Sequence, residues 1–268
     1  MKIKISKQLP SKKVPNLRDL GGMKGADGKQ IREGRLIRSA QLYNATKKDL
    51  ALLETLHIRK IFDFRNAQEA KEKPDPSLPG CEYTNLSILD KSSAVSWEAN
   101  RTDPAPKEPK EAKGAPKSGT EQVCEVYRDF VRKPASREQY SRFLRGILDT
   151  EDGAVLWHCT LGKDRCGWGA VLVEVVLGVS REDIIEDYLY SNVCLKHEIA
   201  GMMPILKKLL EKMHMVNAGT AVVEAREEYL AAAFDEAEKL YGSMDAFLEK
   251  GLGIDAAMRD KLRARYLI

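Results

Sequence analysis

The stretch from residue 154 to residue 178 constrains the fold of this chain more than any other part of its sequence. Residues 154–157 form a short apolar run, which is typical of one buried β-strand. A loop that contains Gly162 follows, and residues 167–178 are again apolar over the length of a helix. A strand, a tight loop and a helix in this order indicate an α/β fold.

Other local patterns extend this arrangement along the chain. Three capping patterns, in which Ser or Thr precedes an acidic or amide residue by three positions, predict helix starts at Thr46, Ser136 and Ser180. Residues 60–64 alternate in polarity as a strand does, and residues 194–268 are largely helical in pattern. We therefore expect an α/β fold with a central sheet and flanking helices.

Length and composition favour one domain that spans residues 1–268. The chain is 43% hydrophobic and 31% charged, which allows an ordinary globular core. Residues from about 90 to 120 differ, because prolines and lysines alternate there and few apolar residues could anchor the segment. Such a long segment inside a domain is either a lid or a surface insertion.

Charge and cysteine usage exclude several classes of function. The net charge of +4, from 44 basic and 40 acidic residues, is too small to indicate a nucleic-acid partner. The five cysteines include no Cys-x-x-Cys pair, and the histidines show no metal-ligand spacing, so we expect no metal and no cofactor. No apolar run reaches the roughly 20 residues of a membrane span. We expect a cytoplasmic protein, with a secreted role left open.

The loop between the expected strand and helix has the chemistry of an anion site. Its sequence is His158-Cys159-Thr160-Leu161-Gly162-Lys163-Asp164-Arg165, and we call residues 158–165 the anion loop. The start of a helix presents unpaired backbone N–H groups and the positive end of the helix dipole. These features also favour the thiolate form of a cysteine at the base of the loop, here Cys159. Arg165 can hold two phosphoryl oxygens with its planar guanidinium group.

His158-Cys159-x5-Arg165 resembles the signature of the protein tyrosine phosphatase superfamily. The fuller pattern His-Cys-x-x-Gly-Lys-Asp-Arg is similar to that of bacterial tyrosine and dual-specificity phosphatases that also act on phosphoinositides. Residues 16–22, 34–39 and 62–65 match further segments of that family. The resemblance implies a tyrosine phosphatase-like fold, with the catalytic loop between a strand and a helix.

The resemblance also implies roles for individual residues. Cys159 would be the nucleophile, Arg165 the phosphate clamp, and Asp164 the general acid and later the base. Asp63 is a second candidate, either for the acid or for orienting Arg165. Lys163 would contact additional phosphate groups. The predicted phosphate-binding residues are Thr160, Leu161, Gly162, Lys163, Asp164 and Arg165.

Three departures from the family pattern bear on activity. Cys166 stands where a Ser or Thr usually follows the arginine, and a thiol is the weaker hydrogen-bond donor. We therefore expect slower hydrolysis of the phosphoenzyme. No Trp-Pro-Asp motif is present, which favours Asp164 as the acid, and the apolar Leu161 leaves the substrate preference open.

Taken together, the residues and the resemblance predict a phosphomonoester hydrolase that forms a phosphocysteine intermediate. A phosphotyrosine protein is the leading substrate. One alternative is a phosphoinositide phosphatase, in which Lys163 and the lysines of residues 107–117 would meet further phosphates. The other is a pseudophosphatase that binds phosphate without turnover.

Overall fold

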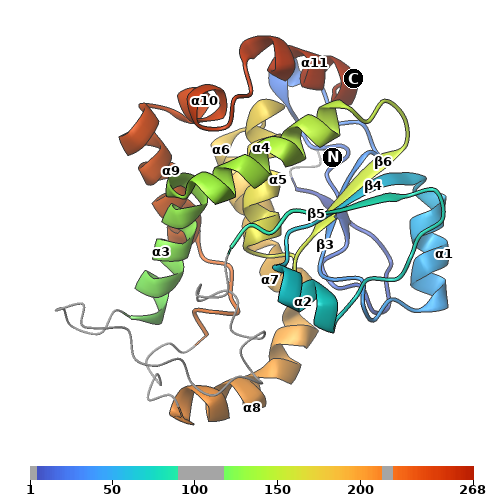
Figure 1. Ribbon diagram of the computed structural model, residues 1–268, viewed down its shortest axis with the longest axis vertical. Helices are drawn as coiled ribbons and strands as arrows, with labels where there is room; N and C mark the ends of the chain where they lie inside the picture. Colours follow the sequence, from blue (N-terminus) through green and yellow to red (C-terminus); the bar gives the residue numbers. More distant parts are fainter. Residues whose placement is uncertain (1–4, 90–117, 213–219) are drawn as a thin grey trace.

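A computed structural model describes residues 5–89, 118–212 and 220–268, and within them a six-stranded sheet forms the centre of the molecule (Figure 1). The strand order is β1-β2-β3-β6-β4-β5. Strands β3, β6, β4 and β5 run parallel, while β1 and β2 are antiparallel to their neighbours. The strands are β1 (Lys7–Gln8), β2 (Arg18–Asp19), β3 (Leu36–Ser39), β4 (Ile58–Asp63), β5 (Glu82–Asn85) and β6 (Ala154–His158).

Strand β6 lies between β3 and β4 and is buried along its whole length. Its residues alternate between two hydrophobic cores: Val155 and Trp157 join one, and Ala154 and Leu156 join the other. The apolar run that predicted this strand is continuous because both faces of the sheet are covered.

Helices cover the two faces unequally, as Figure 1 shows. Helix α1 (Lys47–Thr55) lies on one side, where Leu53 packs into the smaller core. Most of the remaining helices lie on the other side, around the larger core. They are α3 (Gly119–Arg132), α4 (Pro134–Leu148), α5 (Arg165–Val176), α6 (Arg181–Leu189), α9 (Glu227–Tyr241) and α11 (Ala256–Tyr266).

Other helical elements complete the described chain. They are η1 (Ala26–Gly28), α2 (Ala67–Glu72), α7 (Ser191–Cys194), α8 (Lys196–Lys212), α10 (Met244–Ala246) and the π-helical turn η5 (Phe247–Gly251). Figure 1 shows α2 at the end of the sheet where β6 leads into α5, and α8 beyond α7 at the lower end of the molecule.

Two of the three predicted helix starts are confirmed. Thr46 forms a capping box with Asp49, and the Ser180 hydroxyl accepts the Asp183 N–H. The prediction at Ser136 is wrong: α4 begins at Pro134, and the Ser136 hydroxyl donates to the Ile88 carbonyl 2.8 Å away. Proline suits the first helical position because its φ is already helical and it has no N–H to satisfy.

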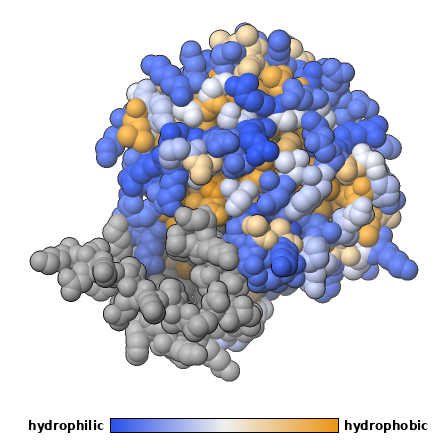
Figure 2. All heavy atoms as spheres, viewed as in Figure 1, coloured by the Kyte–Doolittle hydropathy of each residue, from blue (hydrophilic) through white to orange (hydrophobic). Residues whose placement is uncertain are grey.

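The sheet with its flanking helices confirms the predicted α/β class. The prediction of a lid or insertion at about 90–120 falls mostly on residues 90–117, which lie outside the described residues; α3 starts at Gly119. In the described part of the chain, no helix combines the length and apolar character that crossing a membrane requires. On the face shown in Figure 2, hydrophilic residues surround smaller hydrophobic areas.

Candidate active site

The anion loop lies at the carboxyl end of β6, where parallel strands present their ends together. Strand pairing places Ser39 of β3 and Asp63 of β4 on either side of His158. Cys159 follows directly, is only 2% exposed and belongs to the larger core. Arg165 begins α5, and both ends of the predicted Cys-x5-Arg motif are therefore brought to one helix start.

Two carbonyl groups of the loop accept hydrogen bonds from side chains outside it. Asn16 donates from Nδ2 to the carbonyl oxygens of Gly162 and Leu161, at 2.9 and 3.3 Å. Arg38 donates from Nη2 to the same Gly162 oxygen at 3.0 Å. Gly162 has a φ of 67°, and a Cβ there would lie 2.4 Å from the Ser39 carbonyl oxygen, so this position requires glycine.

The next feature of the loop is the set of backbone N–H groups of residues 160–165. Among the described residues, none of the N–H groups of residues 160–165 donates a hydrogen bond. Unpaired N–H groups at the start of a helix attract an anion, through their own donors and through the helix dipole. Phosphate binding by residues 160–165 stays a prediction.

Arg165 is held by a carboxylate that the sequence analysis did not identify. Its Nη1 and Nη2 donate to the two carboxylate oxygens of Glu69 at 2.7 and 2.9 Å. Burial lowers the pKa of Arg165, but the hydrogen bonds and charge of Glu69 outweigh burial and raise it above its ordinary value. The Thr160 hydroxyl also contacts both groups, since it accepts from Nη2 and donates to Glu69.

The Nε of Arg165 is buried and has no hydrogen-bond partner among the described residues. Arg18 and Arg38 also keep an unpaired Nε, so a missing partner alone does not mark a site. Arg165 differs in its position, because it closes the loop whose N–H groups are also unpaired. Its Nε is therefore available to an oxygen of a bound phosphoryl group.

Glu69 is the third residue of α2 and forms a capping box with Asn66. Burial raises the pKa of Glu69, but the hydrogen bonds and charge of Arg165 outweigh burial and hold it below its ordinary value. The spacing of Asn66 and Glu69 could have predicted the start of α2 from the sequence. It could not have predicted that this carboxylate reaches Arg165, 96 positions away.

Asp164 and Lys163, two neighbouring residues of the anion loop, form a buried ion pair. The Lys163 ammonium lies 3.0 Å from Asp164 Oδ1 and donates to the carbonyl oxygens of Val222 and Glu224 at 3.1 and 2.9 Å. The Tyr127 hydroxyl also donates to Asp164 Oδ1, at 2.9 Å. Lys163 is thus buried, and its side chain faces protein carbonyls in this conformation.

Asp63 lies beside the loop but is bound to a different arginine. Its carboxylate accepts from Nε and Nη2 of Arg65 and from the Tyr83 hydroxyl at 2.6 Å. Burial raises the pKa of Asp63, but the charge of His158 and the hydrogen bonds from Arg65 and Tyr83 hold it below its ordinary value. Asp63 therefore orients Arg65, and the carboxylate that binds Arg165 is that of Glu69.

Oxygen and nitrogen atoms of Asp63, Asp75 and His158 lie within 4.8 Å of one another, a spacing that could surround a metal ion. Arg65 already bridges the two carboxylates, with Nη2 at 2.8 Å from each. Burial lowers the pKa of His158, but the charges of Asp63 and Asp75 raise it overall. The cluster thus balances its negative charges with its own cations.

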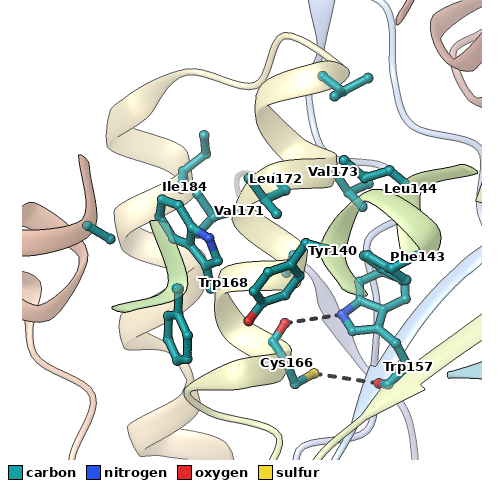
Figure 3. Packing of buried hydrophobic residues seen from close by; sticks show 14 of the residues in the cluster. Tyr140, Phe143, Leu144, Trp157, Cys166, Trp168, Val171, Leu172, Val173 and Ile184 are labelled. Atoms are coloured by element: carbon teal, nitrogen blue, oxygen red, sulfur yellow. Dashed lines mark hydrogen bonds between the residues drawn. The ribbon is translucent and has the colours of Figure 1, made fainter. Parts of the chain in front are cut away.

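Cys166 points away from the solvent into the larger core (Figure 3). Its thiol donates to the Trp157 carbonyl at 3.5 Å, while its own carbonyl accepts from the Trp157 indole at 3.1 Å. Burial raises the pKa of Cys166 to about 12, so it stays a thiol. These two contacts fix the first turn of α5 to β6 and hold the two ends of the anion loop together.

Comparisons with known proteins agree with this geometry. The family model described as the tyrosine phosphatase family matches residues 9–268. A Cupriavidus necator protein, named as a tyrosine-protein phosphatase, is 31% identical over 95% of this chain and 86% of its own length. The triple specificity protein phosphatase PtpB of Mycobacterium tuberculosis is 25% identical over 87% of this chain and 91% of its own. A tyrosine-protein phosphatase of Nostoc commune is 27% identical over 58% of this chain and 47% of its own. The predicted resemblance is confirmed, and the chain belongs to the tyrosine phosphatase family.

Proposed function

We propose that this enzyme hydrolyses phosphotyrosine in protein substrates and that Cys159 forms the phosphocysteine intermediate. The observation that carries the proposal is a set of donors without partners among the described residues, in the loop that contains Cys159: the N–H groups of residues 160–165 and the Nε of Arg165. A phosphoryl transition state spreads negative charge over three equatorial oxygens, and this arrangement can neutralise that charge.

The reaction would proceed in two steps. The Cys159 thiolate attacks phosphorus, a sulfur–phosphorus bond forms, and the bond from phosphorus to the tyrosine oxygen breaks as Asp164 donates a proton to that oxygen. Water then attacks phosphorus and gives a proton to Asp164, which releases inorganic phosphate and restores the thiolate. Residues 160–165 hold the three equatorial oxygens through both steps.

The surroundings of the two aspartates support Asp164 as the acid. Asp164 occupies the N-cap position of α5 without a capping hydrogen bond from its side chain, and its Oδ2 makes no hydrogen bond among the described residues. The lowered pKa of Asp63 favours its charged form, which cannot donate a proton. Lys163 would act on Asp164 through their contact and bind phosphate with its backbone N–H.

The names of the relatives favour a protein substrate over a phosphoinositide, because the family and all three relatives are named for tyrosine or protein phosphatase activity. The pseudophosphatase alternative is disfavoured by the intact pair of Cys159 and Arg165. The match over residues 9–268 supports one phosphatase domain over the whole chain. The free thiols of all five cysteines agree with a cytoplasmic location.

The decisive experiment measures phosphate release and trapping with Cys159→Ser. We expect the wild-type protein to hydrolyse a phosphotyrosine peptide and, after acid quench, to carry phosphate on Cys159 detectable by mass spectrometry. Cys159→Ser should release no phosphate and still bind the peptide. Phosphopeptide binding by the wild-type protein without any phosphate release would overturn the proposal in favour of a pseudophosphatase.

A further inference from the structure

A groove of about 300 Å³ runs beside the anion loop and connects it to the N-terminal segment. Thr160 and Leu161 form one wall, and they are the two half-buried residues of the loop, whereas Cys159 and residues 162–165 are buried. Lys12 and Lys13 also line this groove. A side chain next to a phosphotyrosine bound in the loop could therefore enter this groove.

The backbone of the two lysines is fixed by one carboxylate. Asp49 accepts the N–H of Lys12 at 2.6 Å, the N–H of Lys13 at 3.2 Å and the Ser11 hydroxyl at 2.9 Å. Burial raises the pKa of Asp49, but the hydrogen bonds from Thr46, Lys12 and Ser11 lower it to about 2. Asp49 therefore stays charged near neutral pH and holds the segment in place, so little ordering would accompany substrate binding.

The ammonium groups of these lysines remain available. Lys12 and Lys13 are exposed, and no described carboxylate lies within ion-pair distance of either. Glu198 of α8 is the acidic residue that lines the groove, so two positive charges face one negative charge. Two positive charges and one negative charge leave these lining groups net positive, which favours an anionic side chain such as a carboxylate.

The remaining walls provide apolar contact. Leu161, Pro15 and Met202 line the groove together with the lysines. Such a surface suits the methylene groups of an amino-acid side chain, and Met adapts to side chains of different shape. On the basis of the function proposed above, we propose that Lys12 and Lys13 select phosphotyrosine substrates that carry an acidic residue beside the phosphotyrosine.

The test compares two phosphotyrosine peptides that differ only in carrying Glu or Gln next to the phosphotyrosine. One such pair has this residue on the N-terminal side of the phosphotyrosine, and a second pair has it on the C-terminal side. The readout is the ratio of kcat/KM for the Glu peptide to that for the Gln peptide. We expect the wild-type ratio to exceed one on one side, and Lys12→Ala/Lys13→Ala to lower it by about three- to ten-fold, mainly through KM, as expected for exposed ion pairs. High salt should lower the wild-type ratio in the same direction.

A matched control removes two exposed lysines of α1 that do not line the groove, by Lys47→Ala/Lys48→Ala. This variant has the same net charge as the test variant and should keep the wild-type ratio. Equal ratios in the wild type and the test variant, or an equal loss in the control, would overturn the proposal. It would also fail if the test variant lost hydrolysis of phosphoinositide vesicles and kept the peptide ratio. Failure of the wild type to hydrolyse either peptide would count against the proposed function instead.

Discussion

Arg165, which ends the anion loop, and Arg65, which lies near it, are both buried. They differ in how many of their guanidinium nitrogens already bind protein oxygens. In Arg65 every guanidinium nitrogen donates to a protein oxygen: Nε and Nη2 to Asp63, Nη2 also to Asp75, and Nη1 to the Lys73 carbonyl at 2.7 Å. In Arg165 the two Nη atoms are held by Glu69, and Nε has no partner among the described residues.

The difference shows how an arginine can be held in place and still bind an oxygen of a ligand. A carboxylate at the Nη end orients Arg165 and compensates its charge, while the Nε stays free for an incoming oxygen. Every guanidinium nitrogen of Arg65 already donates to a protein oxygen, and its contacts connect β4 to the segment after α2. Arg165 and Arg65 should therefore respond differently to mutation.

The largest effect should distinguish Asp164, which precedes Arg165, from Asp63, which binds Arg65. Asp164→Asn should lower kcat by roughly 100- to 10,000-fold, because the leaving oxygen loses its proton donor. It should also remove the fall in kcat at higher pH that deprotonation of the acid causes. Asp63→Asn should keep that fall, since its contacts are with Arg65 and Tyr83. Full pH profiles of kcat for both variants provide the measurement, and a reversed pattern would assign the acid to Asp63.

The next effect compares the arginines directly. Arg165→Lys should lower kcat by roughly 100- to 1,000-fold, as expected for loss of a preorganised oxyanion donor. Arg65→Lys should act mainly on stability, because one ammonium cannot replace donors to Asp63, Asp75 and Lys73. Urea unfolding and steady-state kinetics on both variants separate the two outcomes. Similar kinetic losses at both positions would show that Arg65 also acts on the reaction.

A smaller effect should follow from Glu69→Gln. The variant keeps the shape of Glu69 but weakens its hold on Arg165, so kcat/KM should fall by about ten-fold, the equivalent of one charge-assisted hydrogen bond. Inorganic phosphate should also bind less tightly as a competitive inhibitor. If activity were unchanged, the contact would serve folding alone.

Glu69 should also contribute to the pH dependence of stability. Its pKa in the folded protein lies below its usual value in an unfolded chain, about 4.3. Its stabilising contribution is therefore complete above that value and is lost as pH falls through the folded pKa. The free energy of unfolding of Glu69→Gln should decline less steeply than that of the wild type below about pH 5. Urea titrations at several pH values between about 3 and 7 would measure this slope.

Much of the active site was predictable because it is contiguous. Cys159, Arg165 and the intervening residues belong to one strand–loop–helix segment, whose pattern alone indicates an anion site. Glu69, Asn16 and Arg38 were not identified as contacts of the loop, since they reach it from distant segments. The side chain of Lys163 was expected at the substrate, and the structure directs it toward the carbonyls at 222 and 224.

The sequence by itself determined the α/β class, the order of the main elements and the residues that begin and end the anion loop. These follow from local physics: hydrophobic periodicity, helix capping and the unpaired donors at a helix start. Only the tertiary structure decided which carboxylate holds which arginine, and which side chains turn the loop carbonyls outward. Those choices depend on contacts between segments 96 to 146 residues apart, for which no local pattern exists.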